Sequence, residues 1–264
     1  MAPSAAYKPD ERSKGVRLAK RTHYDTGLVH NIVNTCSILH VSFNAPAIHN
    51  EPQFPTILPM LGAIARYSTD DIASLYLHGS SVARLFKLTE GGTQELPMCV
   101  AATHIDGYVL ALAPFHNSCN YRSAVCFGHG SLVTSPEEIL FALELITNNS
   151  VPERWENSRS APTKAELTST AILKMTIETA SAKVRTGGPS DDRADSQDRE
   201  LVGRTWTGVV PTYTVLGAPV ESDYNQVKAV PEYLDDWVAD ANSMAEQRAV
   251  DAVDPPPADD GVEG

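Results

Sequence analysis

Short apolar runs bounded by turn-forming residues dominate the chain. Runs rich in β-branched and aromatic residues are typical of strands, and they cover residues 37–43, 56–64, 75–78, 98–103, 107–113, 120–127, 172–185 and 206–215. Pro, Asn and Gly separate several of these runs, which favours antiparallel pairing. The chain shows no regular alternation of strands with helices and no internal repeat. A small antiparallel barrel therefore fits the pattern best.

Helices are expected where a capping residue precedes an apolar segment. Asp25 is suited to N-cap one such segment, and Pro136 opens another with acidic residues near the positive end of its dipole. Thr163 and Glu166 match a capping box. The predicted helices cover residues 28–34, 82–88 and 136–147, a segment that begins near residue 163, and residues 232–250. The sequence thus predicts a mainly β fold with flanking helices, of the α+β class.

Composition divides the chain into an arm, one domain and a tail. Residues 1–20 are rich in charged and small residues, which predicts a flexible N-terminal arm. Residues 21–250 form one domain that contains a charged loop at 190–200 and ends in a helix. Residues 251–264 combine acidic residues with consecutive prolines and hold no basic residue, which predicts a disordered tail.

The charge and the N-terminus argue against several classes of function. A formal net charge of −12 over 264 residues argues against binding to nucleic acid or an anionic membrane, because clustered Lys and Arg bind phosphate groups. Residues 1–13 are polar and lack the apolar core of a secretion signal, and no apolar run approaches the length of a membrane span. We therefore expect a cytoplasmic protein.

Cysteine and histidine spacing indicates no metal site. Cys36, Cys99, Cys119 and Cys126 lack the close pairing of zinc or redox motifs, so reduced, buried thiols are expected. The histidines at positions 104, 116 and 129 do not combine with nearby acids into a metal triad, and no serine lies in the elbow motif of hydrolases. We predict neither a metal site nor a hydrolase triad.

Four segments match a known family in order and spacing. They are LYLHG at 75–79, FHNSCNYRS at 115–123, SAKVRTG at 181–187 and WTGVVP at 206–211. Over residues 21–231 the chain resembles the nitroimidazole-reductase-like branch of the FMN-binding split barrels, within the pyridoxamine-phosphate oxidase-like proteins. The resemblance implies an antiparallel split β-barrel of the FMN-binding type. It also implies a homodimer with two equivalent FMN sites at the interface, each built from both subunits.

Gly79, Ser80, Ser81 and Arg84 are the candidate residues for the FMN phosphate. A phosphate dianion needs amides, hydroxyls and a positive charge in convergent geometry. Gly79 permits close backbone approach, the two serines offer hydroxyls, and Arg84 lies about one helical turn beyond them. An N-capped helix with a solvated arginine explains the same residues, and the resemblance favours the phosphate site.

His78 is the candidate catalytic residue. The resemblance implies that a histidine at this strand end lies beside the flavin and takes a catalytic role. An imidazole that titrates near neutrality can donate a proton or polarise a substrate. A histidine at a strand end is more often structural, so both roles stay open.

Two further segments are expected to meet the cofactor. The resemblance places the extended backbone of Pro59 and Met60 at the edge of the isoalloxazine, and it places residues 121–123 at the cofactor and dimer interface. Strand alternation puts Tyr121 and Ser123 on one face and Arg122 on the other, so only one face can meet the flavin. The alternative for Arg122 is an ion pair with an acidic residue on the barrel surface.

The C-terminal half supplies the remaining candidate contacts. Lys183 and Arg185 share a strand face, and two adjacent cations predict an anion nearby. A phosphate fits that prediction, and Asp191 or Asp192 is the alternative. Trp206 suits a position stacked on the flavin or covering its pocket, although a tryptophan is more often a core residue.

The sequence therefore predicts an FMN-dependent oxidoreductase that moves electrons or hydride to or from a small organic substrate. A nitroaromatic compound, a vitamin-B6-like amine and a specialised metabolite all stay open as substrates. The chain lacks a glycine-rich dinucleotide motif after a strand, so NAD(P)H is expected only as a diffusible reductant. One alternative is a non-catalytic flavin- or haem-binding protein of the same fold, and another is an interaction protein that has lost its cofactor.

Overall fold

Contacts within the chain gather in two compact units. The computed structural model describes residues 5–45, 54–67, 70–89, 95–159 and 161–255. The barrel unit comprises Met1–Thr103 and Ser123–Lys183, and the extension unit comprises His104–Arg122 and Val184–Gly264.

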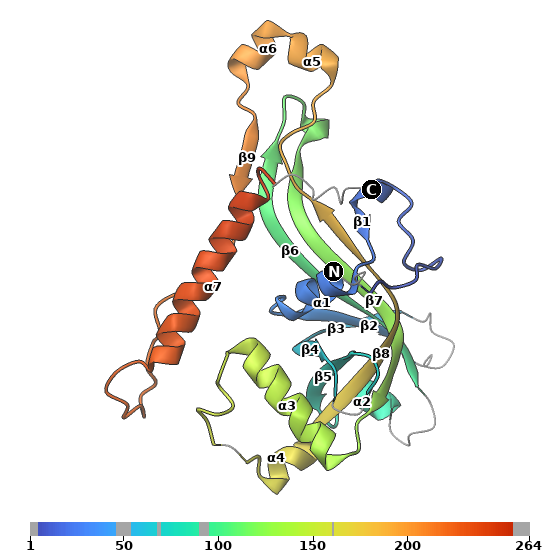
Figure 1. Ribbon diagram of the computed structural model, residues 1–264, viewed down its shortest axis with the longest axis vertical. Coiled ribbons are helices and arrows are strands. Elements are labelled where there is room, and N and C mark those ends of the chain that lie inside the picture. Colours follow the sequence, from blue (N-terminus) through green and yellow to red (C-terminus); the bar gives the residue numbers. More distant parts are fainter. Residues whose placement is uncertain (1–4, 46–53, 68–69, 90–94, 160, 256–264) are drawn as a thin grey trace, which may run out of the picture. The chain divides into compact units, whose positions relative to one another are not determined.

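One sheet connects the strands (Figure 1). They are β1 Thr22–His23, β2 Leu39–Asn44, β3 Pro55–Met60, β4 Gly62–Ala65, β5 Ser74–Ser80, β6 Leu96–Leu110, β7 Ser118–Leu132, β8 Thr170–Arg185 and β9 Gly208–Pro211. The sheet order is β3-β2-β6-β7-β8-β5-β4, with β1 paired to β8 and β9 paired to β6. The pairs β2–β3, β4–β5 and β5–β8 are antiparallel, which confirms the predicted fold class.

Helices flank the sheet, and their starts follow the expected caps. In the barrel unit they are α1 Thr26–Asn34, α2 Arg84–Leu88, α3 Pro136–Ser150 and α4 Lys164–Ser169, with a 3-10 turn at Ala19–Arg21. In the extension unit they are α5 Arg193–Gln197, α6 Arg199–Arg204 and α7 Glu232–Asp251, with a 3-10 turn at Pro114–His116. The Leu28 amide donates to the Asp25 carboxylate at 2.7 Å, and Thr163 with Glu166 forms a complete capping box. Both predicted caps are confirmed.

Strand β5 contributes to two apolar clusters, one on each of its faces. Leu75 and Leu77 are fully buried in the main core, to which β2, β6, β8 and α1 also contribute. Tyr76 belongs to a second cluster that contains residues of α3. Successive strand side chains point to opposite faces, so His78 lies on the Tyr76 face and Gly79 on the Leu77 face. This alternation decides the surroundings of each candidate site residue.

A partly buried ion network fastens α3 to the sheet. The Lys174 ammonium of β8 lies 2.7 Å from Glu138 Oε1 of α3 and 2.8 Å from Asp70 Oδ2. The Tyr76 hydroxyl donates to the same Glu138 oxygen at 2.7 Å. Burial, followed by this hydrogen bond, raises the pKa of Tyr76 well above its ordinary value, so the phenol stays protonated at neutral pH. Two carboxylates therefore share one ammonium.

Two strand boundaries differ from the sequence prediction. The run at 56–64 divides at Leu61 into β3 and β4, which lie at opposite ends of the sheet order. The runs at 98–103 and 107–113 are joined in the single strand β6, which passes through Gly107. A Cβ at Gly107 would lie 2.9 Å from Val209 Cγ1 of β9. The neighbouring strand, rather than a turn, therefore requires glycine at this position.

The extension unit forms helices where the sequence predicts a charged loop. The prediction of a loop at 190–200 is wrong because α5 lies within that segment and α6 starts there. The Asp198 carboxylate accepts hydrogen bonds from the amides of Glu200 and Leu201 at 3.0 and 3.1 Å and so caps α6. Such a local cap satisfies amides that would otherwise be free at a helix start.

Buried polar contacts hold the end of α7. Asn120 of β7 is fully buried, and its amide group donates to the Gly187 and Ala252 carbonyls at 3.1 and 2.9 Å. The Gly187 amide also donates to the Ala252 carbonyl, at 2.8 Å. Ala252 is therefore fixed, although it lies in the segment 251–264 that the sequence predicts to be disordered. Residues 256–264 of that predicted tail lie outside the described residues.

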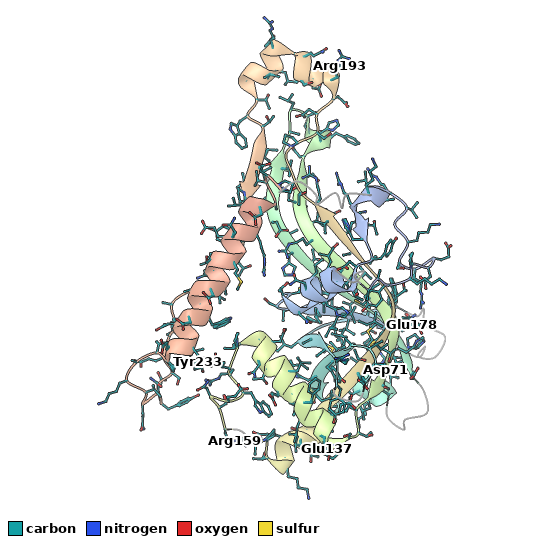
Figure 2. All side chains as sticks on the ribbon, viewed as in Figure 1. Asp71, Glu137, Arg159, Glu178, Arg193 and Tyr233 are labelled. Carbon is teal, nitrogen blue, oxygen red and sulfur yellow. The ribbon has the colours of Figure 1, made fainter. Side chains whose placement is uncertain are left out.

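The segment predicted as a flexible N-terminal arm contacts β8. The Arg12 guanidinium lies 2.9 Å from Glu178 Oε2, and Glu178 is labelled in Figure 2. Ser13 is buried, and its hydroxyl lies 2.6 Å from the Thr179 hydroxyl. The arm is therefore anchored at residues 12 and 13, while residues 1–4 lie outside the described part of the chain.

Two further expectations concern the state of the cysteines and the lack of a membrane-spanning segment. All four cysteines are free thiols, but the expected burial is confirmed for Cys126 alone, because the other three are partly exposed. Burial raises the pKa of Cys126 to about 12, so this thiol stays protonated at neutral pH. Within the described ranges, no helix combines the length and the apolar character needed to cross a membrane.

Candidate functional site

The site residues at the end of β5 divide between the two faces of the strand. A Cβ at Gly79 would lie 2.6 Å from the Phe86 ring and 3.6 Å from Met60 Cε, so Gly79 and Met60 face the main core. The close approach that this glycine permits is to the Phe86 ring of α2, and its contact with a phosphate stays a prediction. His78 and Ser80 lie on the opposite face.

His78 presents a neutral, half-buried imidazole. It pairs with Ile172 of β8 in the sheet register. Burial lowers the pKa of His78 below its ordinary value, so the ring is uncharged at neutral pH. Its nitrogens have no hydrogen-bond partner among the described residues. A neutral imidazole offers one N–H donor and one acceptor nitrogen, so this ring can exchange a proton with a bound molecule.

An open hollow of about 770 Å³ adjoins the end of β5. It is lined by the β5–α2 turn on one side and by α4 on the other, through Ser80, Ser81, Val82, Lys164, Ala165, Thr168 and Ser169. The structure thus brings two predicted phosphate residues, Ser80 and Ser81, together with Lys164 of α4. The capping box located the start of α4, but no local signal in the sequence indicates what that helix faces.

Arg84, Pro59 and Met60 do not converge on the hollow. Arg84 is exposed at the start of α2 and is not among the residues that line the hollow. Pro59 is exposed on β3, whereas Met60 packs against the main core. Because the two residues alternate across the strand, only Pro59 presents its side chain to solvent.

In the extension unit, Arg122 forms an ion pair. Its guanidinium makes two hydrogen bonds to the Asp106 carboxylate, at 2.8 and 2.9 Å, and Asp106 is buried. An acidic partner for Arg122 is thus confirmed, but it is buried and does not lie on the surface as the sequence alternative expected. A contact between Arg122 and a cofactor stays a prediction. Tyr121 is half-buried. Ser123, in the barrel unit, donates its hydroxyl to the Lys183 carbonyl at 3.3 Å.

The two cations of β8 meet carbonyl groups. Lys183 Nζ donates to the Arg17 carbonyl at 3.4 Å. The Arg185 side chain, in a residue 6% exposed, donates to Asn120 Oδ1 and to the Gly188 carbonyl, the latter at 3.1 Å. The acids that the sequence offered as partners bind elsewhere, because Asp191 accepts from the Leu112 amide and Asp192 lies beside His116.

Trp206 is neither buried nor part of the hollow. It is 65% exposed, and its ring lies over Gly208, where a Cβ would come within 2.6 Å of the ring. The backbone φ of Gly208 is +155°, which also favours glycine. The core alternative considered from sequence is therefore wrong for Trp206, and its contact with a flavin stays a prediction.

No metal centre competes with this site in the described part of the chain. There, no group of three or more His, Cys, Asp or Glu side chains is placed to hold a metal ion.

Acid is expected to destabilise the fold through His78. Its folded-state pKa lies below the unfolded value of 6.5, so the unfolded chain binds more protons and stability falls as the pH drops through 6.5. Between about pH 7.5 and 5, the melting temperature of the His78→Gln variant should fall less than that of the wild type. His40→Gln, at an exposed position on β2, is the matched control. Parallel curves for His78→Gln and the wild type would contradict this account.

The sequence matches the family model described as pyridoxamine 5′-phosphate oxidase over residues 25–184. That segment starts at the cap of α1 and ends in β8, so it includes His78 and the hollow. A search of the curated proteins found no match.

Two solved structures share the fold over most of the chain, and a third is less similar. The flavocytochrome Anf3 from Azotobacter vinelandii is 27% identical with a TM-score of 0.69, over 88% of this chain and 98% of that one. The FAD and haem binding protein from Mycobacterium smegmatis is 24% identical with a TM-score of 0.66, over 83% and 97%. A candidate 5-nitroimidazole antibiotic resistance protein from Bacteroides thetaiotaomicron is 17% identical with a TM-score of 0.45, over 62% and 86%.

Proposed function

Since this chain belongs to the pyridoxamine 5′-phosphate oxidase family and has the flavin-binding split-barrel fold, we propose that it is an FMN-dependent oxidoreductase. The observation that carries the proposal is the end of β5, where a neutral, half-buried His78 and an exposed Ser80 share one face of the strand. When bound, the flavin supplies electron and hydride transfer. The chain supplies binding, orientation and a group that exchanges protons.

The donor set at the hollow fits the phosphate end of a flavin nucleotide. The Ser80 hydroxyl has no acceptor among the described residues, so it is available to a ligand. Hydroxyl and cationic donors are the groups that bind phosphate oxygens. We assign the phosphate to the Ser80 hydroxyl. The Ser81 hydroxyl donates to the Thr168 carbonyl and so holds the turn beside it, and Arg84 does not line the hollow. The exposed Pro59 is assigned to the edge of the ring system.

His78 is assigned the proton transfer. A neutral imidazole can accept a proton at one nitrogen or donate from the other, and the burial that lowers the pKa of His78 keeps it neutral at physiological pH. Ser123 is assigned to the wall of the flavin site, and contacts of Tyr121 and Trp206 with a flavin stay predictions. Arg122 is already paired with Asp106, so its role is to position β7.

NAD(P)H is the proposed diffusible reductant. A small organic molecule, such as a nitroaromatic compound or a specialised metabolite, is the proposed acceptor of the electrons that a bound flavin would carry. A homodimer is the proposed working form, with residues of both subunits at each flavin. If the protein holds stoichiometric FMN but sediments as a monomer, the shared site is wrong.

Haem binding is the second candidate function. It is favoured by the flavocytochrome from Azotobacter vinelandii, which is 27% identical and aligns over 88% of this chain, more than residues 25–184 cover. Histidine is a common axial ligand of haem iron. A flavin and a haem in one protein would make this chain an electron-transfer protein as well as a flavoenzyme.

Absorbance spectra of the purified protein separate these candidates. We expect the paired near-ultraviolet and blue bands of a flavin, with FMN released on denaturation and identified by mass. An intense Soret band in addition to the flavin bands would establish the haem candidate. A Soret band without flavin bands would replace the first proposal with the second. A colourless protein that takes up neither added FMN nor haemin would contradict both.

A further inference from the structure

We propose that Lys164 of α4 makes the hollow selective for the phosphate of a flavin nucleotide, either the monoester of FMN or the diphosphate of FAD. This inference rests on the proposed function, and it adds a binding residue from an element that the sequence motif does not include. The juxtaposition that carries it is Lys164, Ser80 and Ser81 around one cavity.

Helix α4 is fastened to the turn that follows β5. The Ser81 amide donates to the Ser169 carbonyl at 2.9 Å, and the Ser81 hydroxyl donates to the Thr168 carbonyl at 3.0 Å. Ser80 is also paired with Thr170 in the β5–β8 ladder. The two walls of the hollow are therefore held together before any ligand enters, which reduces the ordering that binding requires.

Most hydroxyl hydrogens around the hollow are already donated. The Thr168 hydroxyl donates to the Lys164 carbonyl at 2.8 Å, and the Ser169 hydroxyl donates to the Glu166 carbonyl at 3.1 Å. The Ser81 hydroxyl is used as well. Each hydroxyl carries one donor hydrogen, so these three can only accept further bonds. Among the side chains of the lining residues, the donors left for an anion are the Ser80 hydroxyl and the Lys164 ammonium.

Lys164 carries an ammonium that has no ion-pair partner among the described residues. Glu166, two positions along α4, is bound by the Arg159 guanidinium at 2.6 Å and by the Thr163 amide at 2.6 Å. Arg159, labelled in Figure 2, thus neutralises the acid nearest in sequence to Lys164. An ammonium with no ion-pair partner in the described part of the chain, on a residue that lines a cavity, favours a ligand of opposite charge.

The other cations predicted for the phosphate are less suited to it. Lys183 donates to a backbone carbonyl, and Arg185 is buried among carbonyl groups. Neither residue lines the hollow. The volume of about 770 Å³ exceeds what one phosphate fills and lies within the range of about 300–1,000 Å³ for small-molecule sites. Both flavin nucleotides are therefore compatible with it.

Affinities for riboflavin, FMN and FAD test the inference. They are measured by flavin fluorescence on the full-length apoprotein, for the wild type, Lys164→Ala, Lys164→Arg and the control Lys87→Ala on α2. We expect Lys164→Ala to lower the affinity for FMN or FAD about 10-fold or more, because a charge-assisted hydrogen bond is lost. The affinity for riboflavin should be unchanged. Lys164→Arg should retain most of the affinity, and Lys87→Ala should match the wild type.

The outcomes separate this inference from the proposed function. If Lys164→Ala loses more affinity for FMN than for FAD, the monoester is the ligand. If it loses more affinity for FAD, the diphosphate is the ligand. If Lys164→Ala binds both nucleotides as the wild type does, the inference is overturned while the flavin function stands. An equal loss of affinity for riboflavin and FMN also overturns the inference, because a purely structural effect would weaken the binding of both. If the wild type binds no flavin, the proposed function fails first and the inference fails with it.

Discussion

Replacement of Gly128 by alanine is expected to lower the free energy of unfolding by roughly 3 kcal/mol. Gly128 lies in β7, and a Cβ there would overlap the Thr176 carbonyl oxygen of β8 and lie 3.2 Å from Ile177 Cα. Both obstacles are backbone atoms of a central strand, so neither can rotate away as a flexible side chain would. The strands would have to separate locally, in the middle of the barrel unit.

Gly188→Ala is the matched control for this change. Nothing lies within 4 Å of a Cβ at Gly188, and its backbone is not left-handed. Its unfolding free energy should stay within about 0.5 kcal/mol of the wild type. Urea denaturation followed by circular dichroism measures both variants. Equal stability of Gly128→Ala and the wild type would mean that β7 and β8 are not packed as described.

The Asn120→Ala variant is expected to lose roughly 3 kcal/mol of stability in the extension unit. Asn120 is fully buried and accepts a hydrogen bond from Arg185, which is itself buried. Alanine removes the two bonds to the Gly187 and Ala252 carbonyls and leaves part of the guanidinium without its partner. The end of α7 should then open first.

Amide hydrogen exchange locates that loss. In Asn120→Ala, the protection of residues 248–253 against hydrogen exchange should fall markedly. The amides of β5 should stay as protected as in the wild type. Asn225→Ala, at an exposed site where the side chain bonds only to nearby Glu221 and Val227, should leave the exchange pattern unchanged. Protection at 248–253 equal to that of the wild type would show that Asn120 does not anchor α7.

The sequence predicts those features that depend on local pattern. Runs rich in β-branched and aromatic residues correctly place β5 and β8, and the caps at Asp25 and Thr163 correctly start two helices. The family resemblance supplies the barrel, because motif order and spacing carry information that strand propensity lacks. Boundaries are less well predicted: the sequence indicates two runs, at 98–103 and 107–113, where the structure has the single strand β6. Within that strand, the approach of Val209 from β9 is what requires Gly107.

The candidate site is harder to predict because it depends on contacts between distant segments. Sequence shows that Arg122 and Lys183 are cationic, but only the fold shows Asp106 against the first and a carbonyl against the second. Lys164 is the reverse case, because no sequence motif indicates it and the structure places it at the hollow. It stands 80 residues after Arg84 in the sequence, and the hydrogen bonds of Ser81 bring its helix to the same cavity.

Reduction of the bound cofactor by NADPH in the absence of oxygen distinguishes a flavin-dependent oxidoreductase from a protein that only binds flavin. A flavin-dependent oxidoreductase predicts that the blue absorbance band bleaches on addition of NADPH and returns when an electron acceptor is admitted. The band is followed on the protein as purified, with its FMN content known from the released cofactor. A flavin band that NADPH, NADH and dithionite all fail to bleach, or a purified protein that holds no flavin and takes up none, would contradict the account.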